Sequence, residues 1–327
     1  MSLLGNIKGQ DNAVRYLSNS LSSGRLSKSY LFSGPEGVGR ALCAKTFIKA
    51  LVCKNTLSSG EGCSLCPACV KIENNAHSDI TWIKPEKNKS IKIEQIRTAR
   101  EALGLKPFES PLGICVIEDA HCMTIPAGNA LLKVLEEPQE SSVLILITSK
   151  RELLLNTIIS RCSEVRFNSL SVELAKDIIM REMGHLREEE AQFLAYFSQG
   201  SPGKALEIIE EGIEEKKENI IALLESILEE NSPGKRDWMN DDKDNILEDI
   251  DILIMLLRDT VLSGEHLENL MIDKDFMGSE LCGRLKKYGA DGIYDMVGEL
   301  IEMRKALMSN INPKIVAQVL PGVFDRL

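Results

Sequence analysis

The sequence predicts an α/β domain built on a parallel sheet, followed by regions made only of helices. Two observations predict the first part. Strand-like and helix-like segments alternate up to about residue 168, and the strand-like runs 114–117 and 143–148 are continuously apolar. Such runs suit parallel strands buried on both faces, and alternation suits strands joined by helices. A third observation predicts the helical part, because strand signals stop after about residue 169.

Each element of the first part is predicted from its own residues. The predicted strands are 30–33, 80–83, 114–117, 143–148 and 164–167. The helical patterns between them are 41–52, 93–103, 125–135 and 151–159. We therefore assign residues 1–168 to one α/β domain.

The helical part divides into two further domains. Residues 169–210 carry three short amphipathic patterns, for which Gly184, Gly200 and Gly212 are natural stops. Residues 211–327 carry longer patterns, at 214–230, 246–262, 291–310 and 313–320. The polar segment 231–245 holds Pro, Gly, Asn and Asp and is predicted to be a loop.

Length and composition limit the class of protein. A chain of 327 residues with 43% hydrophobic residues is long enough for two or three domains with cores of their own. No apolar run approaches the roughly 20 residues that cross a bilayer, and the first residues lack the pattern of a signal peptide. We expect a cytoplasmic protein without membrane contact. The net charge of −10 argues against binding nucleic acid alone.

Residues 33–43, SGPEGVGRALC, follow a strand and lead into a helix, which is the setting of a phosphate-binding loop. Gly34, Gly37 and Gly39 allow backbone N–H groups to converge on an anion. Arg40 stands where the loop pattern has Lys, and Ala41 stands where it has Ser or Thr. Because Ala41 removes a magnesium ligand, we predict a degenerate loop that does not hydrolyse nucleotide. An ordinary glycine-rich turn is the alternative.

Two adjacent carboxylates end the predicted strand 114–117. Glu118 and Asp119 resemble the acidic pair that holds Mg²⁺ in ATPases, although their order is reversed from Asp-Glu. We predict a degenerate acidic pair beside the loop. The alternative is a strand end with two solvated acids.

Four of the nine cysteines fall within residues 53–69, with the spacing C-x9-C-x2-C-x2-C. Two-residue gaps let a tight turn present sulfurs to a tetrahedral ion, so we predict that these four thiols hold Zn²⁺. Four thiolates leave no open position, which predicts a structural rather than catalytic site. Free thiols or another thiophilic metal are the alternatives. The predicted ligands are Cys53, Cys63, Cys66 and Cys69.

The triplet Ser160-Arg161-Cys162 precedes the predicted strand 164–167. One interpretation is a helix end with a basic residue. The other is that Arg161 acts as a finger, which stabilises transition-state charge in the ATP site of another chain.

These motifs occur in an order that resembles the delta-prime family of bacterial DNA polymerase III clamp-loader subunits, within the AAA+ superfamily. The resemblance covers most of residues 1–210. Its strongest part is NALLKVLEEP at 129–138 followed by the Ser-Arg-Cys triplet. The other matching stretches are residues 9–40, the cysteine module, SIKIEQIR at 90–97, residues 117–149 and GSPGKAL at 200–206.

The resemblance implies an architecture and a role. Residues 1–168 would form the AAA+ domain with a zinc insertion at 53–69, residues 169–210 a helical lid, and residues 211–327 a collar for oligomerisation. The subunit would join three gamma/tau subunits and one delta subunit, and the assembly would load the beta sliding clamp onto primed DNA. Arg161 would act in trans on a gamma/tau site. ATP and Mg²⁺ would not be turned over by this subunit, whose lid segment offers Gly203 and Lys204 where ATPases often have Arg.

Two other functions remain open from the sequence. An active clamp-loader ATPase of the gamma/tau type would share the sheet, the cysteine module and the Ser-Arg-Cys triplet, but Arg40, Ala41 and the reversed acidic order argue against it. A zinc-dependent nucleic-acid binder would use the cysteine module, but the negative charge argues against that.

Overall fold

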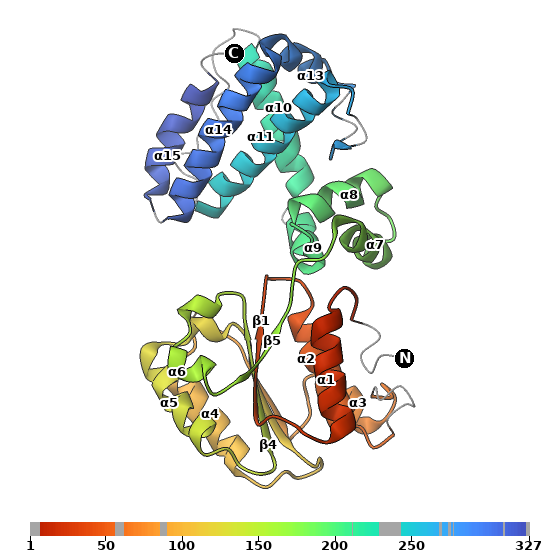
Figure 1. Cartoon of the computed structure of the whole chain (residues 1–327), viewed down its shortest axis with the longest axis vertical. Helices are drawn as coiled ribbons and strands as arrows, with labels where there is room; N and C mark the ends of the chain where they lie inside the picture. Colours follow the sequence, from red (N-terminus) through yellow and green to blue (C-terminus); the bar gives the residue numbers. More distant parts are fainter. Residues whose placement is uncertain are drawn as a thin grey trace. The chain divides into compact units, whose positions relative to one another are not determined.

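The computed structural model of the chain describes residues 7–55, 62–85, 90–210, 212–228, 243–267, 270–273, 276, 278–309 and 311–324. The chain divides into two compact units (Figure 1). The first unit consists of Met1–Ala175 and Gln199–Lys204, and the second of Lys176–Ser198 and Ala205–Leu327.

The first unit is built on a parallel sheet of five strands, in the order β2-β3-β4-β1-β5. All five predicted strands are present, and each end lies within one residue of its prediction. The strands are β1 Ser29–Ser33, β2 Ile80–Ile83, β3 Gly113–Ile117, β4 Ser142–Thr148 and β5 Ser163–Arg166. The prediction of a parallel α/β fold is confirmed.

Helices cover both faces of this sheet, as Figure 1 shows. One face carries α1 Asp11–Ser23, α2 Arg40–Val52 and α3 Pro67–Glu73. The other face carries α4 Ile93–Gly104, α5 Ile125–Glu136 and α6 Asn156–Ile159.

The predicted continuous helix at 151–159 was wrong. A 3₁₀ turn, Arg151–Leu153, is separated from α6 by two residues in extended conformation. Leu154 is buried in the core on the α4–α6 face of the sheet, which accounts for the break, and Leu155 directly precedes α6.

The strands are apolar throughout because successive side chains enter different cores. On β1, Tyr30 and Phe32 join the core beneath α1 and α2, whereas Leu31 joins the core beneath α4 and α5. On β3, Val116 and Ile117 divide in the same way. This is the burial that the continuous apolar runs predicted.

In its described residues, the second unit consists of helices and the segments that connect them, without a strand. Its helices are α8 Glu188–Phe197, α10 Ile213–Leu228, α11 Lys243–Gly264, α13 Glu280–Leu285, α14 Gly289–Met308 and α15 Pro313–Val319, with most of α7 Val172–Glu182 and α9 Pro202–Glu210. No predicted helical pattern covers α13. Of the predicted loop 231–245, residues 243–245 belong to α11, and 231–242 lie outside the described residues. No helix in the described chain has the length and apolar character needed to cross a membrane.

Charged side chains also hold the second unit together. Lys217 lies over the ring of Phe193, 5.2 Å from its centroid, and Arg258 lies 5.3 Å from the ring centroid of Tyr196. Asp259 is fully buried and accepts hydrogen bonds from the backbone N–H groups of residues 272 and 273, at 2.9 and 2.7 Å. Burial raises the pKa of Asp259 to about 6.

Candidate functional site

The carboxyl ends of the strands bring the predicted loop and acidic pair to one edge of the sheet. Ser33 at the end of β1 pairs with Thr148 at the end of β4, and Ile117 at the end of β3 pairs with Leu146. The helices that follow β1 and β4 lie on opposite faces of the sheet. In open α/β sheets, such a reversal is where ligands bind.

The loop after β1 is held by a segment from far along the chain. Gly37 has φ +69°, and a Cβ there would lie only 2.3 Å from Ser201 Oγ and 2.4 Å from Lys204 N. Gly203 N–H donates to Gly37 O at 2.9 Å, and Ser201 Oγ donates to Glu36 O at 2.5 Å. The glycine is therefore required both by its backbone conformation and by the close approach of residues 201–204.

The end of this loop leaves open space at the start of α2. Gly39 precedes the helix with φ +96°, and a Cβ there would meet no atom within 4 Å. Gly34 also has a positive φ, and its N–H donates to Thr148 O at 3.3 Å, which joins the loop to β4.

Arg40 is the first residue of α2 and is only 6% exposed. Burial lowers its pKa, and the nearby carboxylates of Asp119, Glu36 and Glu118 oppose that effect by favouring the charged form. Its Nη1 is buried and has no hydrogen-bond partner among the described residues. Ala41, the next residue, is exposed and offers no hydroxyl. A guanidinium thus occupies the space between the loop and the acidic pair.

The acidic pair is divided between two environments. Glu118 forms an ion pair with Lys84, which follows β2, at 2.8 Å. Asp119 has the left-handed backbone conformation, φ 47° and ψ 48°, which few non-glycine residues adopt. Such conformations cluster at functional sites.

His121 and Thr148 also lie at this edge, although neither was predicted to be a site residue. His121 Nδ1 lies 3.1 Å from Thr148 Oγ1, which also accepts the N–H of Lys150 at 3.1 Å. Burial lowers the pKa of His121. The position of Thr148, a hydroxyl residue at the end of a predicted central strand, could have indicated a site residue. No sequence pattern distinguished Lys84 or His121.

Arg161 lies after α6 and contacts its own chain. Its Nη2 lies 2.9 Å from Glu136 Oε1 at the end of α5, and its Nη1 donates to Thr157 O at 3.0 Å. The side chain is 38% exposed. No contact joins it to the described residues of the loop, so Arg161 is separate from the chain's own phosphate-loop edge.

The four predicted cysteine ligands come together as one cluster. All four Sγ atoms lie within 4.8 Å of one another. Cys53 follows the end of α2, Cys66 precedes α3, and Cys69 lies within α3. Between them, Ser64 has a positive φ of 56°, and the backbone N–H of Cys66 donates to Cys63 Sγ at 3.3 Å.

The chemistry of this cluster fits a zinc ion. In a tetrahedron with Zn–S bonds of about 2.3 Å the sulfurs stand about 3.8 Å apart, and Cys53 Sγ and Cys66 Sγ are 3.9 Å apart. Hydrogen bonds from the backbone N–H groups of Leu65 and Cys66 lower the pKa of the Cys63 thiol to about 6, which favours its thiolate, whereas burial raises the pKa of the Cys69 thiol to about 12.

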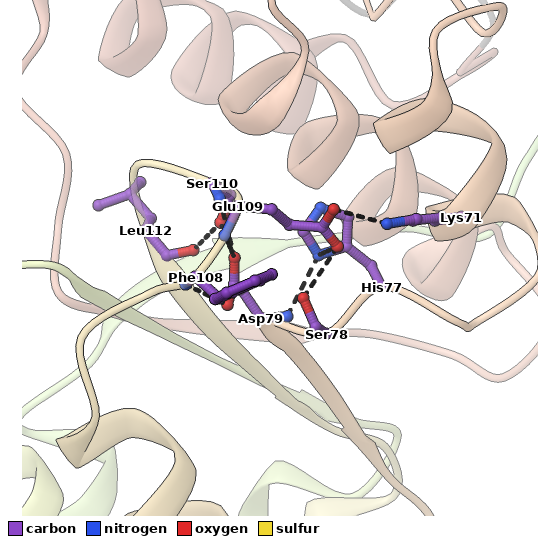
Figure 2. Close-up of polar contacts among 8 residues, drawn as sticks. All are labelled: Lys71, His77, Ser78, Asp79, Phe108, Glu109, Ser110 and Leu112. Atoms are coloured by element: carbon purple, nitrogen blue, oxygen red, sulfur yellow. Dashed lines mark hydrogen bonds and ion pairs between the residues drawn. The ribbon is translucent and has the colours of Figure 1, made fainter.

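A polar network fastens the cysteine module to the sheet (Figure 2). The carboxylate of Asp79 accepts the backbone N–H groups of Phe108, Glu109 and Ser110, at 2.7, 2.8 and 2.8 Å, and the hydroxyl of Ser110 at 3.0 Å. Glu109 pairs with Lys71 of α3 at 2.6 Å. The loop between α4 and β3 is thereby joined to α3.

His77 lies inside this network and is buried (Figure 2). Its Nδ1 accepts the N–H of Asp79 at 3.3 Å and lies 3.8 Å from Glu109 Oε1. Its Nε2 has no hydrogen-bond partner within the described part of the chain. Its Nδ1 contacts are thus with Asp79, just before β2, and with Glu109 in the loop after α4.

Comparison with known proteins identifies the class. The family described as "DNA polymerase III, delta subunit" matches residues 9–171. The match covers just under half of the chain, which resembles this family of DNA polymerase III subunits there. Among curated proteins, it is 28% identical to the delta' subunit of Bacillus subtilis strain 168 over 310 residues, or 93% of this chain and 92% of that protein. The resemblance to delta-prime is confirmed.

Other relatives match over a shorter range. The chain is 32% identical to the tau subunit of Bacillus subtilis strain 168 over 211 residues, which are 63% of this chain and 37% of tau. It thus spans little more than a third of that relative. A solved gamma-subunit-related protein of Thermotoga maritima has 19% identity and a TM-score of 0.45, covering 95% of this chain and 98% of that one.

Proposed function

We propose that the chain is a non-hydrolysing subunit of a DNA polymerase III clamp loader. It assembles with gamma/tau and delta subunits in the cytoplasm, and through that assembly it helps to load the beta sliding clamp onto primed DNA. The similarity to delta' along nearly the whole chain supports this role.

The buried position of Arg40 is the main observation that supports our proposal that the chain does not hydrolyse ATP. In an active site of this type, Lys reaches the terminal phosphates and a hydroxyl binds Mg²⁺. Arg40 instead lies among Asp119, Glu36 and Glu118, and Ala41 has no ligand atom. Because Glu118 is engaged by Lys84, the acidic pair also lacks the arrangement that polarises water.

Arg161 supplies the positive charge that the chain contributes in trans. Its side chain is half exposed and held by Glu136, so it already lies on the protein surface. In the assembly, the Arg161 guanidinium leaves the Glu136 carboxylate and instead contacts the phosphates of the ATP bound by a gamma/tau neighbour. A finger of this kind is worth about 10³-fold or more in the rate of its site.

The cysteine cluster holds zinc as a structural ion in this proposal. Cys53, Cys63, Cys66 and Cys69 supply the four thiolates. The ion joins the end of α2 to α3 and thereby stabilises the first unit.

The test reconstitutes the chain with gamma/tau and delta subunits and measures phosphate release. Arg161→Ala should assemble normally but remove the turnover of the facing site, about one third of the total if three sites act independently. Arg151→Ala is the matched control, because Arg151 is similarly exposed and pairs with Glu164 at 2.9 Å. Equal rates for wild type and Arg161→Ala would refute the role in trans.

The alternative is an active ATPase of the gamma/tau type, which the 32% identity to tau favours. The isolated chain decides between the two proposals. Magnesium-dependent phosphate release that disappears on replacing Glu118 or Asp119 would establish the alternative.

A further inference from the structure

Helix α3 has only seven residues, so its order depends on what holds its two ends. Isolated helices shorter than about 12 residues are marginal in water. At the start, Cys66 precedes the helix and Cys69 is buried in its first turn, and both belong to the cysteine cluster. At the end, Ile72 is buried in the core and Glu73 pairs with Lys45 of α2 at 3.8 Å. The cysteine cluster therefore sets part of the order of α3.

The loop between α4 and β3 is anchored by apolar burial only at its end, where Leu112 packs against the core. Within the described chain, none of residues 104–111 is buried. Leu105 is 71% and Phe108 90% exposed, so these large apolar side chains face the solvent. Because the hydrophobic effect rewards only apolar surface that leaves water, the order of residues 105–110 depends on their polar contacts.

Glu109 joins this loop to α3 and to the segment that leads from α3 into β2 (Figure 2). Its Oε2 accepts a hydrogen bond from Lys71 Nζ at 2.6 Å, and its Oε1 accepts one from Ser78 Oγ at 2.8 Å. The ring of His77 is buried beside it, with Nδ1 3.8 Å from Oε1. Lys71 and the thiol ligand Cys69 belong to the same short helix. One carboxylate thus connects the helix that carries a ligand with the exposed loop.

We propose that metal binding at the cysteine cluster is energetically coupled to the order of residues 105–110, through the contacts of Glu109 with Lys71 and Ser78. A bound ion fixes the first turn of α3, and α3 in turn fixes the ammonium group that holds the loop. Such coupling is reciprocal, so an ordered loop also strengthens metal binding. The inference depends on the zinc site of the proposed function, but not on clamp loading or ATP turnover.

The test measures amide hydrogen exchange of the full chain, with zinc bound and after its removal by a chelator under reducing conditions. The amides of residues 108–110 should exchange about fivefold faster without zinc, at the low end of the usual range of coupling. The low end is expected because the side chains of Lys71 and Glu109 are 44% and 27% exposed. The amides of β4, whose residues are all buried, should keep their protection.

Two variants test the route of the coupling. Glu109→Ala removes both contacts, so the amides of Phe108 and Ser110 should exchange at the same rate with and without zinc. Lys71→Met removes the direct contact with α3 and should remove most of the zinc dependence. Lys176→Met is the matched control, because Lys176 forms an ion pair of the same length, 2.6 Å, with Glu188 in the second unit. It should keep the full zinc dependence.

Zinc affinity provides the reciprocal measurement. In competition with a chromophoric chelator, Glu109→Ala should bind zinc more weakly than wild type, by the same factor of about five. Wild-type zinc affinity and wild-type zinc dependence of exchange in Glu109→Ala would overturn this inference and leave the proposed zinc site intact. Faster exchange throughout β4 on zinc removal would mean that the ion holds the whole unit, which also overturns it. A wild-type chain that binds no zinc would overturn the proposed site as well.

Discussion

Replacing Asp79 by Ala should loosen the loop between α4 and β3 and destabilise the first unit. The carboxylate accepts three backbone N–H groups and one hydroxyl, all within 3.0 Å. A hydrogen bond to a charged group contributes about 1.5–3 kcal/mol. Because the loop is partly exposed, water replaces some of the lost contacts, so we expect a total loss of about 3 kcal/mol.

Two measurements follow this loss. The thermal midpoint of the first unit should fall by about 6–12 °C, given about 2–4 °C per kcal/mol for a unit of this size. Amide hydrogen exchange at Phe108, Glu109 and Ser110 should accelerate. Glu101→Ala, which removes an exposed carboxylate of α4, is the control and should change neither quantity.

The same group predicts a pH dependence. Burial alone would raise the pKa of Asp79, but the hydrogen bonds from residues 108–110 outweigh it and leave the pKa below its ordinary value. Its contribution is therefore present above the unfolded pKa of about 3.9 and is lost as the pH falls below that. If Asp79→Ala left both the midpoint and the amide exchange unchanged, the carboxylate would not be holding the loop.

Three further predictions concern the metal, a buried acid and the phosphate loop. Elemental analysis should find about one zinc per chain in the wild type and none in Cys69→Ser. Cys122→Ser, which changes a cysteine outside the cluster, is the control and should keep its zinc, and zinc-free wild-type protein would refute the site. Between about pH 4 and pH 6 Asp259 binds a proton only in the folded chain, because its pKa there is about 6. The free energy of unfolding of the wild type, relative to that of Asp259→Asn, should therefore fall as the pH rises through this range. Parallel curves of unfolding free energy against pH for the two proteins would contradict this. The double variant Arg40→Lys with Ala41→Ser should still release no phosphate from ATP as an isolated chain, because Glu118 of the acidic pair remains paired with Lys84. Mg²⁺-dependent turnover would show that the two loop residues alone had prevented hydrolysis.

Patterns of neighbouring residues predicted the sheet and the cysteine cluster well. Continuous apolar runs marked β3 and β4 because both faces of each strand are buried. The C-x2-C-x2-C spacing anticipated that Cys63, Cys66 and Cys69 lie together, since the turn and α3 are local structures.

Contacts between distant residues could not be predicted in this way. The pairing of Lys84 with Glu118, and that of Arg161 with Glu136, depend on which strands and helices become neighbours. The break before α6 has the same origin, because Leu154 enters a core made by other elements. Apolar periodicity alone favoured an unbroken helix there.

Arg40 has a consequence for how the phosphate-loop edge responds to its surroundings. In an ATPase, the cation beside the acidic residues is a diffusible metal ion that arrives and leaves with nucleotide. Here the balancing charge is covalently part of α2 and is always present. Under the proposed function we therefore expect the local electrostatics to be constitutive, and the shape of this edge to stay the same whether magnesium is scarce or plentiful.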